Sequence, residues 1–152
     1  LPGSLDALRL LSEQGYLIIV MTNLSIIGRN MVSEPELRHI HNKMVEAVAA
    51  HGGKIEAILY CPHSPEDGCA CRKPQPGLIY QARDAYSLDL SQTCMIGDSL
   101  KDIQCARAAG CGKVILVRTG YGRQTEQICR EDDMRPDYVA PDLLAAVRWL
   151  LP

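Results

Sequence analysis

Hydrophobic residues follow two alternating patterns along this chain. Short apolar runs predict β-strands over residues 16–22, 55–60, 93–97 and 113–118, with a short edge strand at 138–140. The run at 16–22 is apolar throughout, which is typical of a parallel strand covered on both faces. Amphipathic stretches between the runs predict helices over residues 4–14, 33–51, 76–87, 100–109, 124–130 and 141–151, the last with Pro141 in its first turn. Ser33-Glu34-Pro35-Glu36 is a capping box that should open the helix at 33–51.

The alternation of strand and helix predicts an α/β fold with a doubly wound, mostly parallel sheet. The chain has 152 residues, 47% of them hydrophobic, and shows no repeat or linker, so we expect one domain over residues 1–152. A net charge of −2 argues against nucleic acid or an anionic membrane as a partner. No apolar run is long enough to span a bilayer and no secretion signal is visible at Leu1, so we expect a cytoplasmic protein. The oligomeric state stays open, a monomer included.

Two groups of polar residues follow predicted strands, where ligands of parallel sheets bind. Thr22-Asn23-Leu24-Ser25 comes after the first strand and could hold phosphate oxygens, or Thr22 and Ser25 could simply form a turn or an N-cap. Asp98 and Asp102 follow the strand at 93–97, and their carboxylates suit Mg²⁺. The alternative is helix capping, with Ser99 as the N-cap and Asp102 in the first turn.

A cluster of cysteines and one histidine lies in a loop rich in Pro and Gly. The spacing of Cys61, His63, Cys69 and Cys71 offers three thiolates and an imidazole, which suit a closed, structural zinc site. The alternative is a chance group of buried cysteines. We expect the remaining four cysteines to pack as small buried hydrophobic residues: Cys94, Cys105, Cys111 and Cys129.

Basic residues follow this cluster directly. Arg72 and Lys73 lie where a metal-stiffened loop could present them to phosphate, although a solvated basic pair is the alternative. Arg29 is ambiguous in the same way. The other histidines show no metal spacing among themselves, and we expect them at the surface: His39, His41 and His51.

Taken in order, the motifs T-N-x-S, C-P-H-x-P…C-x-C-R-K-P, I-G-D-S-x-x-D and L-V-R-T-G resemble the haloacid dehalogenase (HAD) superfamily. Within it, the chain looks like the heptose 1,7-bisphosphate phosphatases, and the zinc-containing histidinol-phosphate phosphatases are the alternative. The resemblance implies a Mg²⁺-dependent phosphate monoester hydrolase of carbohydrate metabolism that acts on a small sugar bisphosphate.

The resemblance also implies roles for individual residues. Thr22 and Lys73 would stabilise the transferring phosphoryl group, and Asp98 would bind Mg²⁺ with Asp102 in support. The zinc ligands would be Cys61, His63, Cys69 and Cys71. Contacts to substrate and phosphate would come from Thr22, Asn23, Ser25, Arg29, Arg72 and Lys73.

Two departures from the family pattern change the expectation. Leu24 stands where these phosphatases usually carry Gln. The family's first motif, D-x-D, supplies the nucleophilic and the acid–base aspartate, and no D-x-D occurs in these 152 residues. We therefore expect a chain that lacks the family's first strand and is inactive alone. Its rival is a zinc-stabilised pseudo-phosphatase that binds phosphate without turnover, and a zinc module for nucleic acid is a weaker third reading.

Overall fold

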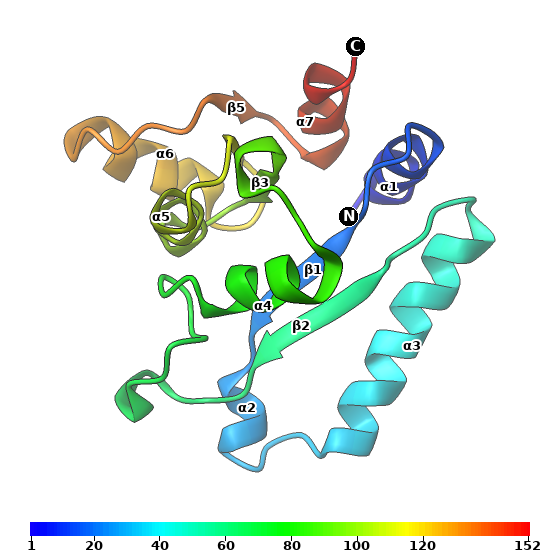
Figure 1. Ribbon diagram of the computed structural model, residues 1–152, viewed down its shortest axis with the longest axis vertical. Coiled ribbons are helices and arrows are strands. Elements are labelled where there is room, and N and C mark those ends of the chain that lie inside the picture. Colours follow the sequence, from blue (N-terminus) through cyan, green and yellow to red (C-terminus); the bar gives the residue numbers. More distant parts are fainter. The chain divides into compact units, whose positions relative to one another are not determined.

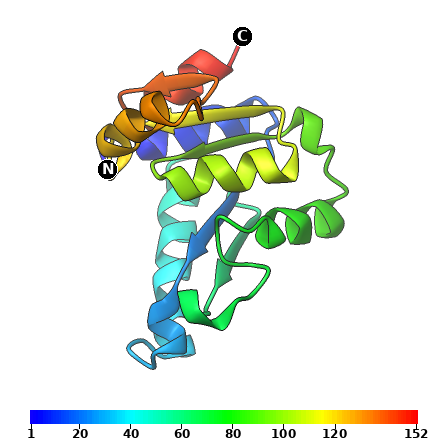
Figure 2. The same ribbon diagram turned by 90° about the vertical axis from the view of Figure 1, so that its left-hand side faces the viewer.

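The computed structural model describes all of residues 1–152 and contains two compact units, Leu1–Arg72 and Lys73–Pro152 (Figures 1 and 2). Every strand pairing in either unit is parallel, and helices alternate with strands along the chain. The predicted α/β class with parallel strands is therefore confirmed. No helix of the chain combines the length and apolar character needed to cross a membrane.

The first unit is built around two parallel strands. β1 pairs with β2 from Ile19 opposite Ala57 to Asn23 opposite Cys61, so the last residues of both strands lie side by side. Figure 1 shows the long helix α3 running alongside this pair. The elements of the unit are α1 (Ser4–Glu13), β1 (Ile19–Asn23), α2 (Ser25–Gly28), α3 (Glu34–Ala50), β2 (Ala57–Cys61) and the 3-10 turn η1 (Pro65–Asp67).

The second unit contains a three-stranded sheet in the order β3-β4-β5. The middle strand β4 is buried from Val114 to Val117, and α5, α6 and α7 all pack against it. Its elements are α4 (Gly77–Tyr86), the 3-10 turn η2 (Leu90–Gln92), β3 (Cys94–Gly97), α5 (Leu100–Ala109), β4 (Lys113–Val117), α6 (Gly122–Glu131), β5 (Tyr138–Ala140) and α7 (Leu143–Leu150).

Helix starts follow the local signals of the sequence. Ser33 caps α3 through its hydroxyl, which accepts the N–H of Glu36, while the Glu36 carboxylate accepts the N–H of Ser33. Ser99 and Asp102 form the same reciprocal pair at the start of α5. Both capping predictions are therefore confirmed.

Two local predictions are wrong, and one helix was not predicted. The first strand starts at Ile19 rather than at residue 16, and all five β1 residues are only half-buried, because β1 has a single partner strand in its unit. Helix α7 begins after its N-cap Asp142, which places Pro141 outside the first turn. The one-turn helix α2 was not expected, because four residues are too few to show helical periodicity.

A bidentate ion pair joins helix α6 to the residue that follows β4. Arg118 donates from Nε and Nη2 to the two carboxylate oxygens of Glu126 at 2.8 and 3.0 Å. These hydrogen bonds outweigh the desolvation of the carboxyl and lower the pKa of Glu126 to about 2. The folded pKa lies below the ordinary 4.5, so the pair stabilises the fold above pH 4.5 and loses its effect as the pH falls toward 2.

Replacing Glu126 by Gln should lower the thermal midpoint at pH 6, because the ionic half of the pair is removed. The deficit relative to the native chain should shrink as the pH falls from 4.5 toward 2, where the native carboxyl takes up its proton. Calorimetry across that range measures the difference. Glu131→Gln on the same helix, where the side chain is exposed, is the control. A deficit that does not depend on pH would contradict this assignment.

Candidate functional site

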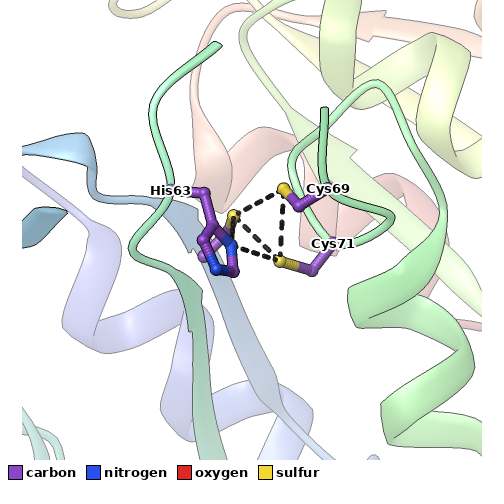
Figure 3. A group of neighbouring side chains, drawn as sticks. His63, Cys69 and Cys71 are labelled. Atoms are coloured by element: carbon purple, nitrogen blue, oxygen red, sulfur yellow. Dashed lines mark hydrogen bonds between the residues drawn. The ribbon is translucent and has the colours of Figure 1, made fainter. Parts of the chain in front are cut away.

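The predicted Cys/His cluster assembles in the first unit. The ligand atoms of Cys61, His63, Cys69 and Cys71 all lie within 4.8 Å of one another. Figure 3 shows the side chains of His63, Cys69 and Cys71 pointing toward a common centre. Cys61 is buried as the last residue of β2, while the other three come from the loop that follows it. The alternative of a chance group of buried cysteines does not describe this cluster, because only Cys61 of its three cysteines is buried.

The spacing of these atoms suits a tetrahedral metal ion. Around Zn²⁺, with Zn–S bonds of about 2.3 Å, two sulfurs would lie about 3.8 Å apart. The Sγ of Cys69 lies 3.5 Å from that of Cys61 and 3.6 Å from that of Cys71, while the Cys61 and Cys71 sulfurs lie 2.9 Å apart and would have to separate around a bound zinc ion. The Nδ1 of His63 lies 3.4 Å from the Cys61 sulfur and 3.3 Å from the Cys71 sulfur. The donor set fits zinc with Nδ1 as the fourth ligand.

The thiols of the cluster are electrostatically unequal. Burial raises the pKa of the Cys71 thiol to about 12, and its hydrogen bonds to the other two sulfurs reinforce this by holding its proton. Burial also opposes ionisation of Cys69, but hydrogen bonds to its sulfur from Cys61, the Arg72 backbone and Cys71 lower its pKa to about 6. The surroundings therefore favour a thiolate on Cys69 over one on Cys71.

The loop that carries the cluster is anchored by backbone hydrogen bonds on one side. Leu24 donates its N–H to the Cys61 carbonyl at 2.8 Å, and Gly28 donates to the Pro62 carbonyl at 3.2 Å. A side chain at Gly28 would overlap that carbonyl, so glycine is what lets α2 approach the loop. The T-N-x-S segment and the metal loop therefore form one connected structure.

The T-N-x-S residues lie where the strand meets α2. Thr22 and Asn23 are the last residues of β1, and Ser25 is the first residue of α2. All three are half-buried, and Arg29, just after α2, is exposed. The expectation of a simple turn is too simple, because Thr22 and Asn23 still pair with β2. The alternative of a Ser25 N-cap is wrong, since Leu24 occupies that position.

Neither cation of the Arg-Lys pair is simply solvated. Arg72 donates from Nη1 to the His63 carbonyl at 3.1 Å, which ties it to the metal loop. In the second unit, Lys73 forms an ion pair with Asp102 at 2.6 Å, with side-chain exposures of only 13% and 8%. The alternative of a solvated basic pair is therefore wrong for both residues.

Both oxygens of Asp102 are engaged. Its Oδ1 accepts from Lys73, while its Oδ2 accepts from the backbone N–H of Ser99 at 3.1 Å and from the Ser99 hydroxyl at 2.8 Å. Gly97 passes so close to this carboxylate that a side chain there would overlap it. Asp102 is thus placed to hold Lys73 and to cap α5, and little of it remains for a cation.

Asp98 is held differently. It follows the last residue of β3, and its Oδ2 accepts the backbone N–H of Tyr121 at 3.0 Å. Its Oδ1 accepts no hydrogen bond within Lys73–Pro152. A half-buried carboxylate with one hydrogen-bonded oxygen and one oxygen without a hydrogen bond fits a divalent cation. The Tyr121 amide is a contact that the sequence analysis missed, and only the glycines on either side of Tyr121 hinted at a close backbone approach.

The cysteines and histidines outside the cluster are mostly placed as predicted. Burial raises the pKa of the Cys94 and Cys105 thiols to about 11, as expected of thiols packed as hydrophobic groups. Cys105, Cys111 and Cys129 are buried, while Cys94 is half-buried. Among the histidines, His39 and His51 are exposed, whereas His41 is half-buried with its ring edge-to-face on Tyr60.

Comparisons with known proteins agree on one family. The HAD-hydrolase-like family model matches residues 70–146. The D-glycero-β-D-manno-heptose-1,7-bisphosphate 7-phosphatase of Bordetella bronchiseptica is 45% identical over 82% of this chain and 69% of its own length. The enzyme of that name from Pseudomonas aeruginosa is 42% identical over 82% of this chain and 70% of its own.

Solved structures show the same likeness. The crystal structure of the D,D-heptose 1,7-bisphosphate phosphatase from B. bronchiseptica, complexed with magnesium and phosphate, matches with a TM-score of 0.90 at 41% identity. The match covers 99% of this chain and 82% of that one. The Burkholderia thailandensis enzyme matches with a TM-score of 0.77 at 32% identity, over 99% and 84% of the two chains.

Replacing Asp102 by Asn should destabilise the protein by about 3–5 kcal/mol, because the Lys73 ammonium is left buried without its counter-charge. Urea unfolding measures the loss. The control is Asp84→Asn, which breaks an ion pair with Arg83 that is open to solvent and should barely move the midpoint. In the double variant Lys73→Met/Asp102→Asn, part of the lost stability should return. Equal effects of Asp102→Asn and Asp84→Asn would rule out a buried pair.

Proposed function

The chain belongs to the haloacid dehalogenase superfamily, as a phosphatase, and on that premise we propose that its residues serve Mg²⁺-dependent hydrolysis of a sugar bisphosphate, D-glycero-D-manno-heptose 1,7-bisphosphate. One observation at the end of β3 carries the proposal. Asp98 keeps a carboxylate oxygen open for a cation, while Asp102 holds the ammonium of Lys73. The two heptose phosphatases reported above as sequence relatives support this substrate over histidinol phosphate.

Each residue has a proposed role that fits its surroundings. Lys73, oriented by Asp102, would neutralise charge on the transferring phosphoryl group. Thr22, Asn23 and Ser25 would donate to phosphoryl oxygens where β1 meets α2. Arg72 would recognise the substrate as a fork held by the His63 carbonyl, and exposed Arg29 would contact a more distant part of it.

The metal role falls to Asp98, and Asp102 supports it indirectly. When bound, Mg²⁺ would neutralise charge developing on the phosphoryl oxygens. Since both Asp102 oxygens are occupied by Lys73 and Ser99, we infer that its part is to position Lys73. Asp98 is left as the metal ligand of the I-G-D-S-x-x-D segment.

The missing D-x-D pair limits what these residues do alone. An aspartyl-phosphate route needs a carboxylate nucleophile and an acid–base group, and the 152 residues contain no such pair. We propose that this chain binds the sugar bisphosphate without hydrolysing it. Leu24 adds to this, because an apolar side chain replaces a polar one within the T-N-x-S segment. Binding without turnover is the second candidate function.

Single-domain organisation and a cytoplasmic location stay predictions.

Calorimetric titration with the heptose bisphosphate in Mg²⁺ should show binding, while a phosphate-release assay shows no turnover. Lys73→Met should weaken binding at least about tenfold, because a cation opposite the phosphate is lost. Lys101→Met, which removes an exposed cation of α5, is the matched control and should bind normally. Phosphate release that Asp98→Asn abolishes would refute the claim of inactivity. Absence of binding at millimolar ligand would refute the substrate.

We also propose that Cys61, His63, Cys69 and Cys71 bind one structural zinc ion. Four protein ligands close the coordination sphere, so the ion would hold the loop rather than activate water. Apart from its hydrogen bonds to α2 and Arg72, the loop has little else to hold it, since Cys61 is the only buried residue between positions 61 and 72.

Cys69→Ser should therefore abolish stoichiometric zinc, measured by mass spectrometry of the metal in the purified protein. Cys94→Ser, a half-buried cysteine outside the cluster, should retain one zinc per chain. X-ray absorption at the zinc edge should show three sulfur ligands and one nitrogen in the native protein. One zinc per chain in Cys69→Ser would show that the ligand set is wrong.

A further inference from the structure

The residues that lead into α6 hold Asp98 at two points. The backbone N–H of Tyr121 donates to the side-chain Oδ2 of Asp98 at 3.0 Å. One turn later, the Thr125 hydroxyl donates to the backbone carbonyl of the same aspartate at 2.9 Å. Side chain and backbone of Asp98 are therefore both fixed by a segment 23–27 residues away in sequence.

The close approach of this segment depends on two glycines. Gly120 has a left-handed backbone with φ +58, and a side chain there would overlap the Asp98 carboxylate. Gly122 is buried, and a side chain there would overlap the Val117 carbonyl. The first glycine lets the Gly120–Tyr121 peptide reach Asp98, and the second lets α6 sit directly on the end of β4.

Thr125 is one of only two buried polar or charged residues in the chain, with 4% of its surface exposed. A buried hydroxyl costs free energy unless it forms a hydrogen bond, and here its bond goes to Asp98. The neighbouring Glu126 is bound by Arg118 at the end of β4. Helix α6 is thus held at two neighbouring residues, Thr125 by Asp98 and Glu126 by Arg118.

If the segment Gly120–Tyr121 served only to start α6, it would not need its hydrogen bond to Asp98. Tyr121 is the N-cap residue of α6, and its own side chain makes no capping hydrogen bond. Its backbone N–H is instead accepted by the carboxylate of Asp98, a residue far away in the sequence. Its side chain is largely exposed and only its backbone contacts Asp98. The contact orients a carboxylate and leaves Oδ1 as the oxygen that accepts no hydrogen bond.

We propose that the Gly120–Tyr121 peptide, backed by Thr125, is a positioning element for the Asp98 carboxylate. It holds Asp98 in one side-chain rotamer, so that Oδ1 is presented to a divalent cation at no cost in side-chain entropy. Partners of this kind that orient a metal ligand are worth about 10–100-fold in metal affinity. The inference rests on the proposed function, which makes Asp98 the Mg²⁺ ligand.

The test compares Tyr121→Pro with Tyr121→Ala in the full 152-residue chain. Proline removes the N–H that Asp98 accepts, and the backbone φ of −85 at this position is close to what proline requires. Alanine keeps the N–H and removes the same exposed side chain. The first readout is the set of three-bond NMR couplings that report the Asp98 side-chain rotamer. The second is the Mg²⁺ dissociation constant, followed by amide chemical shifts.

The native chain and Tyr121→Ala should show one Asp98 rotamer, and Tyr121→Pro should show averaged couplings with Mg²⁺ binding about tenfold weaker. If Tyr121→Pro does not fold, Gly120→Ala replaces it, with Gly110→Ala as its control. Gly110 has a similar left-handed backbone, at φ +82, but open space around it, so both alanines are strained and only one displaces Asp98. Averaged couplings in the native chain, or native couplings in the folded test variant, would overturn the proposal.

Asp98→Asn separates the inference from the proposed function. If it abolishes Mg²⁺ binding while Tyr121→Pro binds Mg²⁺ as the native chain does, the positioning role is wrong and the metal role of Asp98 stands. If Asp98→Asn binds Mg²⁺ as the native chain does, the proposed metal ligand is wrong, and the positioning proposal fails with it.

Discussion

A carboxylate in a protein interior must find donors for both of its oxygens, and Asp102 imposes this demand on the second unit. With a side-chain exposure of 8%, it accepts from the Lys73 ammonium on one oxygen and from Ser99 on the other. Lys73, the start of α5 and the end of β3 are all arranged around it. Gly97 is the clearest sign, since any side chain there would occupy the volume of the Asp102 carboxylate. Lys73, the cation that we propose binds phosphate, is in this way positioned by the same carboxylate that helps to cap α5.

The first unit solves its stability problem by other means. Its two strands are half-buried, and the loop after β2 buries no aliphatic side chain. Hydrophobic burial therefore contributes little to holding this loop, and a metal ion that joins Cys61 at the strand end to Cys69 and Cys71 would hold it instead. Because Leu24 and Gly28 donate to the carbonyls of Cys61 and Pro62, order in the cluster reaches the residues of α2 directly.

Features with a strong local signal could be predicted from the sequence. The helices with capping boxes began where Ser33 and Ser99 indicated, and the cluster of Cys61, His63, Cys69 and Cys71 assembled as its spacing implied. Contacts made by the backbone across long sequence distances could not. The Tyr121 amide on Asp98 has no side-chain signature, and the one-turn helix α2 is too short for periodicity. The engagement of both Asp102 oxygens was also hidden, because capping and metal binding call for the same residue types.

Asp98 and Asp102 show how two identical side chains four residues apart acquire different chemistry. Both follow β3, and the sequence offers no reason to separate them. Asp102 turns into the unit and meets a cation and two donors from Ser99, so its charge is fully matched. Asp98 meets a single N–H from Tyr121, so half of its hydrogen-bonding capacity is unspent. A carboxylate oxygen that is held in place but accepts no hydrogen bond from the protein is available to a bound ligand. The difference in their surroundings therefore engages both oxygens of Asp102 and leaves Asp98 with the oxygen that we propose binds a metal ion.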